Sequence, residues 1–577
     1  MIKRYCIGLC LVLFISVGDI SAQNLKIVTG AVDTAFNAHH YFKGITDNDA
    51  KIFVAGKEFP VYRTGAFAAE TELKEGSNEI KITAQRGSEQ TEQNISIFYK
   101  QRKSTAATDG SFAIESVEIF PSENMTVMAG DVIKIRVKAT PNCKVTWLGN
   151  IKLHELPVSE TDGTGGIYQS SYTVKDNDKN FKKPIYVKVS NGKKSIKKEI
   201  KTKISVMNKD AEPLMLRTKG ALPYLNYGLG TDRLGGSKIS HIVEGIVLQT
   251  AGKAGNLYKV QLSRNYQAWI PEDCVDVVSS GVFKPQSLVG SWNARGIDKY
   301  DVLTVSLTDR LPFRTFHEVS PSRIIVDIFG ATANTAWITQ YPETLKQIKN
   351  LTYEQMEDDI FRIIIELSHS HWGHTMEYRG NNLVISVKHQ PKFELNGLHI
   401  AVDAGHGGTN IGARGTTGSI EKNINLKLAK ILQSKLEEKG ATVSLTRNED
   451  EDVGMSERLL LLRKINPDLL VSIHCNAGGS PFTGKGTSTY YRHIGFRPLS
   501  TSILNRLLEL GVSNFGNVGS FNFTLNSPTE YPNVLVETLF ISSPEDEAKL
   551  LDEDFQNKMV EKIIMGLQDF LDEQSQD

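Results

Sequence analysis

The sequence predicts a multidomain protein in which β-rich amino-terminal domains precede an α/β domain with a mostly parallel sheet flanked by helices. The 577 residues are too many for a single hydrophobic core. Up to about Lys392, short alternating apolar runs are separated by Gly, Asn and Asp, which is typical of strands and turns. Beyond Lys392, apolar runs alternate with longer helical patterns, which indicates βα units.

The balance of charges excludes one class of partner. The chain has 66 Lys and Arg residues against 66 Asp and Glu, so its formal net charge is zero. A protein that binds nucleic acid neutralises phosphates with an excess of Lys and Arg. We therefore expect no nucleic-acid partner.

The amino terminus predicts export. Lys3 and Arg4 precede an apolar run over residues 5–17, and Ile20-Ser21-Ala22 follows. That run is short for a membrane span, so residues 1–22 are predicted to be a signal peptide; the alternative is an uncleaved anchor. After its removal we expect no integral membrane span, and a location in the periplasm or cell envelope, or outside the cell.

Few cysteines remain once the signal is removed. Cys143, Cys274 and Cys475 lie far apart, one in each of three predicted domains. Such dispersed thiols do not make a disulfide framework, so the hydrophobic cores must supply the stability.

The first two predicted domains are Ig-like β-sandwiches, over residues 23–100 and 111–207, joined by a Thr/Ala/Ser-rich linker over 101–110. In the second, Asn191-Gly192 predicts a hairpin, because both residue types tolerate positive φ. Lysines crowd this hairpin. They are either a strip that attracts anionic glycans or a solvated strand face that discourages edge pairing, and the second interpretation is favoured.

Two further β domains are predicted. Residues 214–278 end in Gln267–Ile270 and Pro271–Val275, which resemble the SH3-like domains attached to bacterial cell-wall enzymes; Trp269 is expected to be core rather than a ligand platform. Residues 288–389 resemble the amidase-associated domains of wall hydrolases. There His369 and His371 would share one face of a strand, so they form either a metal site or, as favoured, an ordinary aromatic surface.

The last domain, residues 396–577, carries four candidate functional residues. His406 lies in a Gly-rich loop after the apolar strand 399–403, and His474 ends the strand that begins at Leu469. Glu421 begins a helix, and Glu537 ends the strand that begins at Val534. Because loops at the carboxyl ends of strands in an open α/β sheet converge on one crevice, these four side chains are expected to share a site.

The residue types indicate zinc chemistry. Two imidazoles and one carboxylate are a common catalytic zinc set, which leaves a fourth position for water. A second carboxylate can then act as a general base. The alternative for Glu537 is a buried ion pair that stabilises the sheet.

A family resemblance assigns the roles. The motifs Asp403–Gly408, Glu421-Lys422, Ser472–His474 and Val534–Glu537 fall in the order seen in zinc-dependent N-acetylmuramoyl-L-alanine amidases of the family-3 type. The resemblance implies that His406, Glu421 and His474 bind Zn²⁺ and that Glu537 is the catalytic base. It also implies a peptidoglycan substrate, in which the amide bond between the lactyl group of N-acetylmuramic acid and L-alanine is cut.

The sequence departs from the family in a few places. Ala404 replaces a usual Pro and Leu539 a common Gly, and neither touches the proposed chemistry. Phe523–Asn526 stands where an Arg is frequent, which leaves the substrate contacts of that rim open. The segment 480–532 is short for a long helix that would occlude the site.

Two other functions remain open on sequence grounds. A glycan-cleaving hydrolase would use Glu421 and Glu537 as an acid–base pair, but it leaves both histidines unexplained. A noncatalytic wall-binding protein would retain the scaffold without the chemistry, although no expected ligand or base has been lost. For the β domains the sequence leaves three alternatives open: they bind the wall, bind a protein partner, or only space the enzyme from a membrane.

Overall fold

The computed structural model describes residues 24–100 and 112–576, apart from 162, 177, 209–211, 230–237, 279–280 and 336. The predicted signal peptide and linker lie outside the described residues. Within the described ranges no helix is long and apolar enough to cross a membrane. Residues 24–100 form one compact unit, and nearly all of the remaining described residues form a second.

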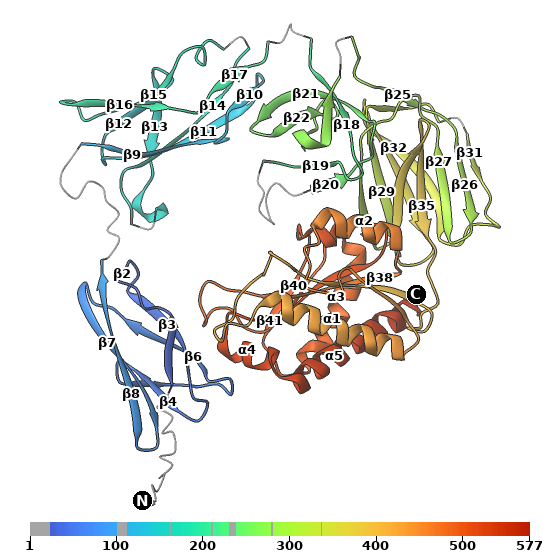
Figure 1. Cartoon of the computed structure of the whole chain (residues 1–577). Helices are drawn as coiled ribbons and strands as arrows, with labels where there is room; N and C mark the ends of the chain where they lie inside the picture. Colours follow the sequence, from blue (N-terminus) through green and yellow to red (C-terminus); the bar gives the residue numbers. More distant parts are fainter. Residues whose placement is uncertain are drawn as a thin grey trace, which may run out of the picture. The chain divides into compact units, whose positions relative to one another are not determined.

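The first unit consists of two mostly antiparallel sheets around a small core (Figure 1). One sheet has the order β1-β3-β6 and the other β2-β8-β7-β4-β5. Alternating burial along β7 and β8 places Ile80, Ile82, Ile95 and Ile97 in the core. The strands are β1 (Leu25–Thr29), β2 (Thr34–Ala35), β3 (His39–Thr46), β4 (Lys51–Val54), β5 (Lys57–Phe59), β6 (Ala66–Glu72), β7 (Gly76–Arg86) and β8 (Glu89–Tyr99).

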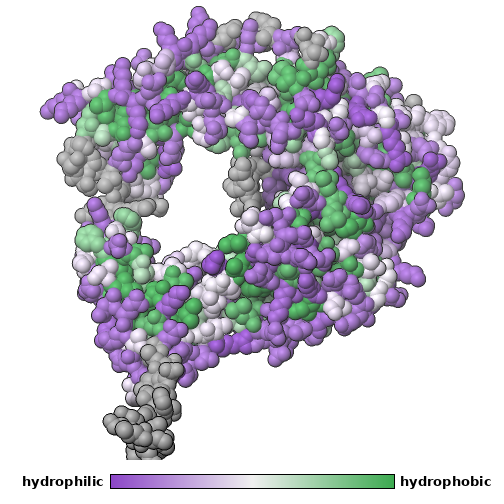
Figure 2. All heavy atoms as spheres, in the orientation of Figure 1, coloured by the Kyte–Doolittle hydropathy of each residue, from purple (hydrophilic) through white to green (hydrophobic). Residues whose placement is uncertain are grey.

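The second unit opens with a seven-stranded sheet of order β16-β15-β12-β13-β14-β11-β9, whose core surrounds Trp147. β15 and β16 form the predicted Asn-Gly hairpin, and its lysines are exposed. Figure 2 shows that the free end of this hairpin is hydrophilic, as a solvated strand face requires. The strands are β9 (Ile114–Phe120), β10 (Met125–Val127), β11 (Val132–Ala139), β12 (Lys144–Trp147), β13 (Ile151–Glu155), β14 (Ile167–Thr173), β15 (Ile185–Ser190), β16 (Ser195–Ile200) and β17 (Ile204–Val206).

The next sheet combines two strands from the region before residue 208 with the strands of residues 215–277. β10 and β17 pair with each other, and β10 pairs with β21, so they join the sheet of the following region. Trp269 is half-buried and packs against the core around Trp147. The further strands are β18 (Met215–Thr218), β19 (Tyr224–Asn226), β20 (Lys238–His241), β21 (Val247–Ala254), β22 (Leu257–Gln261), β23 (Gln267–Pro271) and β24 (Val275–Val277).

Residues 287–388 form two further sheets, β31-β26-β27-β35-β34 and β28-β29-β33-β32, with the short pair β25-β30. One continuous apolar core runs from Leu216 to Val387, so this region and the preceding one are packed as a single body. The strands are β25 (Ser287–Val289), β26 (Trp292–Ile297), β27 (Tyr300–Val305), β28 (Phe313–Val319), β29 (Ser322–Phe329), β30 (Ala331–Ala333), β31 (Ile338–Gln340), β32 (Ile348–Glu357), β33 (Ile360–Leu367), β34 (His374–Arg379) and β35 (Asn382–Lys388).

The carboxy-terminal domain is a six-stranded sheet of order β37-β36-β38-β41-β39-β40. Neighbouring strands are parallel except for β39 and β41, which run antiparallel. The strands are β36 (His399–Ala404), β37 (Thr442–Leu445), β38 (Leu469–Asn476), β39 (Thr487–Tyr490), β40 (Asn514–Val518) and β41 (Asn533–Phe540).

Helices cover both faces of this sheet (Figure 1). One core joins the sheet to α1, α3 and α5, and a smaller one on the other face contains Leu459 and Leu462 of α2. α1 is followed by Gly440 at φ +84°, the left-handed conformation that favours glycine after a helix. The helices are α1 (Glu421–Glu438), α2 (Met455–Ile465), α3 (Arg497–Leu508), α4 (Pro544–Leu550) and α5 (Glu553–Gln574).

Candidate metal centre and active site

The carboxyl ends of the central strands bring the four predicted residues together. β36 leads into the loop that carries His406, His474 lies near the end of β38, and Glu537 lies on β41 beside it. In the sheet register His474 pairs with Glu537. Glu421 is the first residue of α1, so the helix start supplies the remaining carboxylate.

Three of these residues converge tightly. Nε2 of His406 lies 3.2 Å from Oε1 of Glu421, and Nδ1 of His474 lies 3.1 Å from the same oxygen. One potential ligand atom from each residue lies within 4.8 Å of the other two. The two imidazole rings cross edge to face, with centroids 4.9 Å apart.

Backbone groups hold Glu421 in place. Its Oε2 accepts a hydrogen bond from the amide of Ala413 at 2.8 Å, and its Oε1 accepts one from the amide of Cys475 at 3.1 Å. Burial by itself raises the pKa of this carboxyl, but hydrogen bonds and charge from His406 and His474 outweigh that effect and hold the pKa below its ordinary value. The group is therefore an anion at neutral pH.

The pKa of the second imidazole, His474, is shifted upward. Burial lowers the pKa of His474, whereas its hydrogen bond to Glu421 and the negative charge of Glu537 outweigh burial and raise it. The site therefore favours positive charge at this position, which either a proton or a metal ion supplies.

An amide side chain orients His406. This residue has φ +63°, and its Nδ1 lies 2.9 Å from Oδ1 of Asn410. An amide oxygen only accepts, so Nδ1 carries a proton, and Nε2 is the ring nitrogen that can ligate a metal ion. Asn410 was not among the residues predicted from the sequence; its signal was an Asn four residues after a histidine in a turn.

Two glycines leave room for the cluster. A Cβ on Gly405 would lie 2.3 Å from Cε1 of His474, and one on Gly412, at φ +68°, would lie 2.5 Å from Oε2 of Glu421. The loop glycines therefore make space for the side chains, in addition to permitting the turn.

Buried charges support the His406 loop from beneath. The Asp403 carboxylate accepts hydrogen bonds from Thr446 Oγ1 and Ser472 Oγ at 2.6 Å each and forms an ion pair with Arg458. Arg458 also donates to the carbonyl of His406 at 2.6 Å. The pKa of Asp403 stays below its ordinary value although burial opposes this, mainly because of the guanidinium of Arg458.

Glu537 faces the same cavity as the three ligand candidates. Glu537 is 7% exposed. The cavity has a volume of about 520 Å³ and is lined by all four of these residues. Phe523, Thr524 and Leu525 form part of its wall. The short 3-10 turn η4 (Thr524–Asn526) thus supplies a rim beside the four residues.

Asn526 belongs to the rim whose substrate contacts the sequence left open. That side chain is buried, and its Nδ2 donates to the carbonyl of Tyr490 at 3.2 Å and to Asn533 Oδ1 at 3.3 Å. It therefore holds the turn in place. α3, the helix of the 480–532 segment, packs on α5 and not over the cavity.

The expected pairing of His369 with His371 is wrong. His369 is exposed, whereas His371 is buried in the connection between β33 and β34 and approaches His374. The segment is not a strand at that point, so the two-residue spacing does not place both rings on one face. Nor is the group an aromatic surface, because His371 and His374 are buried.

Two imidazoles and two carboxylates at the carboxyl edge of an α/β sheet define a hydrolase-type site. The family model described as N-acetylmuramoyl-L-alanine amidase matches residues 400–569. A second model, described as the AMIN domain, matches residues 293–387.

Individual relatives cover the same carboxy-terminal region. The chain is 32% identical over 183 residues to YqiI of Bacillus subtilis (strain 168), which covers 31% of this chain and 87% of YqiI. It is also 32% identical over 186 residues to the probable cell wall amidase LytH of Staphylococcus aureus. That match covers 32% of this chain and 62% of LytH, so the chain spans less than two thirds of this relative's length. A solved N-acetylmuramoyl-L-alanine amidase from Clostridium difficile 630 is 31% identical, with a TM-score of 0.30, and the match covers 31% of this chain and 98% of that one.

The chain belongs to the N-acetylmuramoyl-L-alanine amidase family, and its carboxy-terminal domain is a peptidoglycan amidase. An AMIN domain lies upstream of it.

Proposed function

We propose that the carboxy-terminal domain is a zinc-dependent N-acetylmuramoyl-L-alanine amidase that cuts the amide bond between the lactyl group of N-acetylmuramic acid and L-alanine. In this proposal His406, Glu421 and His474 hold the zinc and Glu537 is the catalytic base. The observation that carries the proposal is the approach of one ligand atom from each of the three residues to within 4.8 Å.

The donor set fits zinc. Two neutral imidazole nitrogens and one carboxylate oxygen are common ligands of catalytic zinc, and Asn410 fixes the tautomer of His406 that such binding needs. When bound, zinc supplies a Lewis acid that polarises a carbonyl and lowers the pKa of water to about 7.

The protein's own groups move the proton. Glu537 accepts a proton from the attacking water as the water oxygen bonds to the lactyl carbonyl carbon. It then donates that proton to the nitrogen of L-alanine as the C–N bond breaks. The products are a lactyl carboxylate and a free amine, and transfer of this kind typically contributes about 10²–10⁴ in rate.

The glycan-cleaving alternative fits the geometry less well. It needs Glu421 as a free acid or base, yet both oxygens of that carboxylate already accept backbone hydrogen bonds, and one lies against both imidazoles. A carboxyl whose pKa is held low is also a poor general acid.

The remaining domains are proposed as follows. The β domains are taken to be Ig-like sandwiches, an SH3-like domain and an amidase-associated domain that contact the wall or a protein partner, in an exported protein of the periplasm or cell envelope. The proposed ranges are 23–100 and 111–207 (Ig-like), 214–278 (SH3-like), 288–389 (amidase-associated) and 396–577 (zinc amidase).

Digestion of purified peptidoglycan tests the proposal. Zinc-loaded protein should release new amino-terminal L-alanine and no new reducing sugar ends. New reducing ends instead would contradict it in favour of glycan cleavage. Binding to the wall without either product would contradict it in favour of a noncatalytic role. A protein lacking residues before 390, measured in parallel, separates the contribution of the β domains from the chemistry.

A further inference from the structure

A second group of histidines lies outside the amidase site. His317 lies on β28, His371 lies between β33 and β34, and His374 is the first residue of β34. All three are buried, and one ring nitrogen of each lies within 4.8 Å of the other two. The ring centroids are 4.0 Å apart for His317 and His371, 5.1 Å for His371 and His374, and 5.5 Å for His317 and His374.

The hydrogen bonding of this group is incomplete. A neutral imidazole has one donor and one acceptor nitrogen. Nε2 of His371 meets Nδ1 of His374 at 3.0 Å. Both ring nitrogens of His317, Nδ1 of His371 and Nε2 of His374 are buried without a hydrogen-bond partner in the described part of the chain. Such atoms are rare in native proteins, and a missing ion is one explanation for them.

The catalytic domain closes over the histidines. Phe496, at the end of the 3-10 turn η3 (Ile494–Phe496), stacks on the ring of His371 at 5.3 Å. Beside it, a Cβ on Gly495 would lie only 2.9 Å from Nδ1 of His317. The rings are thus enclosed between the β28–β34 region and the amidase domain.

Burial also keeps the rings uncharged. It is the main cause that lowers the pKa of His317 and His371, with neighbouring imidazoles adding to it, and it lowers the pKa of His374 to about 3.

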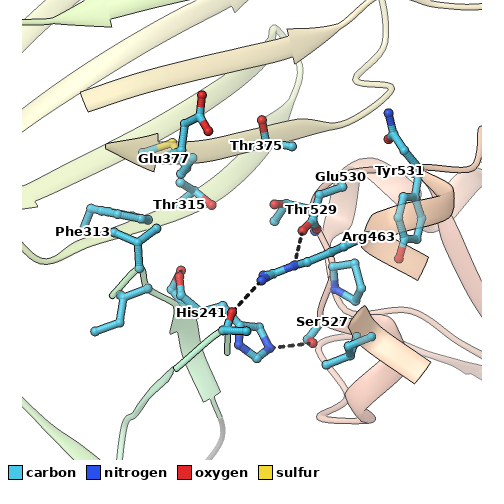
Figure 3. Close-up of a pocket in the computed structure, with 18 of the residues that line it drawn as sticks. His241, Phe313, Thr315, Thr375, Glu377, Arg463, Ser527, Thr529, Glu530 and Tyr531 are labelled. Carbon is cyan, nitrogen blue, oxygen red and sulfur yellow. Dashed lines mark hydrogen bonds and ion pairs between the residues drawn. The ribbon is translucent and has the colours of Figure 1, made fainter. Parts of the chain in front are cut away.

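A cavity reaches the edge of the group. It has a volume of about 530 Å³, and its lining includes Thr315, Thr375 and His493. Figure 3 shows Thr315 and Thr375 at this cavity. Thr315 shares a face of β28 with His317, and the ring of His493 stacks on that of His317, so the cavity offers an approach for a small ion.

We propose that His317, His371 and His374 form a second metal site, for zinc, distinct from the amidase centre. Imidazole nitrogen is a preferred zinc ligand, and three of them leave one tetrahedral position open. The neighbouring His493 is not counted as a ligand, because it is not among the residues whose ring nitrogens lie within 4.8 Å of one another. Zinc at this site ties the β28–β34 region to the turn that carries Phe496.

Zinc content of the full-length exported chain tests the site. A His406→Ala/His474→Ala protein has lost both imidazoles of the amidase centre and leaves the three histidines intact. After dialysis against zinc and removal of loose metal, it should retain one zinc per chain and melt at a higher temperature than its chelated form. Adding His371→Phe should abolish both effects. His369→Phe, at the exposed neighbour, should preserve them.

The second site is overturned if the double variant holds no zinc, or if zinc is retained after His371→Phe. Cobalt absorption of the double variant provides a check that leaves the three histidines unmutated, since three imidazoles should give visible d–d bands; no bands would overturn the site. An active wild-type protein with a single zinc that the double variant lacks would refute this site and leave the amidase proposal standing. If the wild-type protein is inactive and the His406→Ala/His474→Ala variant still carries zinc, the amidase proposal alone is refuted.

Discussion

His474 and Glu537 are direct neighbours in the register of the parallel strands β38 and β41. The pairing places an imidazole and a carboxylate at the same height on the edge of the sheet, where both line one cavity. The charge of Glu537 contributes to the raised pKa of His474. The relative position of the proposed ligand and the proposed base is therefore set by strand register, which is rigid, and not by a loop.

The space beside His474 should be essential to metal binding. Gly405→Ala brings a Cβ to 2.3 Å from the His474 ring, so the ring or the backbone must shift. Overpacking of this kind typically costs about 1–3 kcal/mol, which corresponds to about a 10- to 100-fold loss of zinc affinity. Competition with a chromogenic chelator measures it.

Gly479→Ala is the matched control, because its Cβ would meet nothing within 4 Å. Neither glycine has a positive φ, so the comparison isolates the effect of space. Equal zinc affinity in the two variants would contradict the assigned role of Gly405.

Asn410 should act through His406. Removing its amide oxygen in Asn410→Ala frees the ring that it orients at 2.9 Å. Loss of such an outer contact typically lowers metal affinity 10- to 100-fold. We expect reduced kcat/KM at limiting zinc and recovery toward wild type in excess zinc, measured by peptidoglycan turnover across a zinc titration. Asn423→Ala, at an exposed position of α1, should behave as wild type; a defect in Asn410→Ala that excess zinc does not relieve would argue against an orienting role.

Asp403 should stabilise the domain in a pH-dependent way. Asp403→Asn leaves the buried guanidinium of Arg458 without its counter-charge, and breaking a buried pair typically costs about 3–5 kcal/mol. Because the folded-state pKa of Asp403 is lowered, its contribution is complete above the unfolded-state pKa, roughly 3.9, and is lost as pH falls through the folded value.

Hydrogen exchange of the amides of β36 in urea measures this effect. The difference between wild type and Asp403→Asn should be constant from pH 5 to pH 7 and shrink below about pH 4. Asp572→Asn, at the exposed end of α5, should leave exchange unchanged. A variant as stable as wild type at pH 7 would show that the ion pair contributes nothing.

The sequence was most informative where chemistry and periodicity coincide. The strands β36, β38 and β41 follow from their apolar runs, and the start of α1 at Glu421 follows from its apolar face. However, β38 continues to Asn476 and β41 to Phe540, beyond the His474 and Glu537 that were expected to end them. These positions predicted that the four residues converge, because strand ends in such a sheet meet at one edge.

Other features depend on contacts that no local pattern encodes. β10 and β17 leave their own region to pair with β21, and β39 runs antiparallel to β41, because tertiary packing decides pairing. The approach of His317 to His371 joins residues 54 positions apart through the β28–β33 sheet and the connection after it. Only the histidines at 369, 371 and 374 were visible beforehand, and the prediction wrongly placed His369, which is exposed, and His371 on one face of a strand.

The most direct test of the account is zinc content and turnover of Glu537→Gln. This change keeps the size of the side chain and all three proposed ligands, while removing the group that carries the proton. We predict wild-type zinc content and a loss of turnover on peptidoglycan of about 10²-fold or more, with Glu561→Gln, on the exposed face of α5, unaffected. Turnover within a few-fold of wild type in the zinc-loaded Glu537→Gln protein would contradict the assignment of the catalytic base.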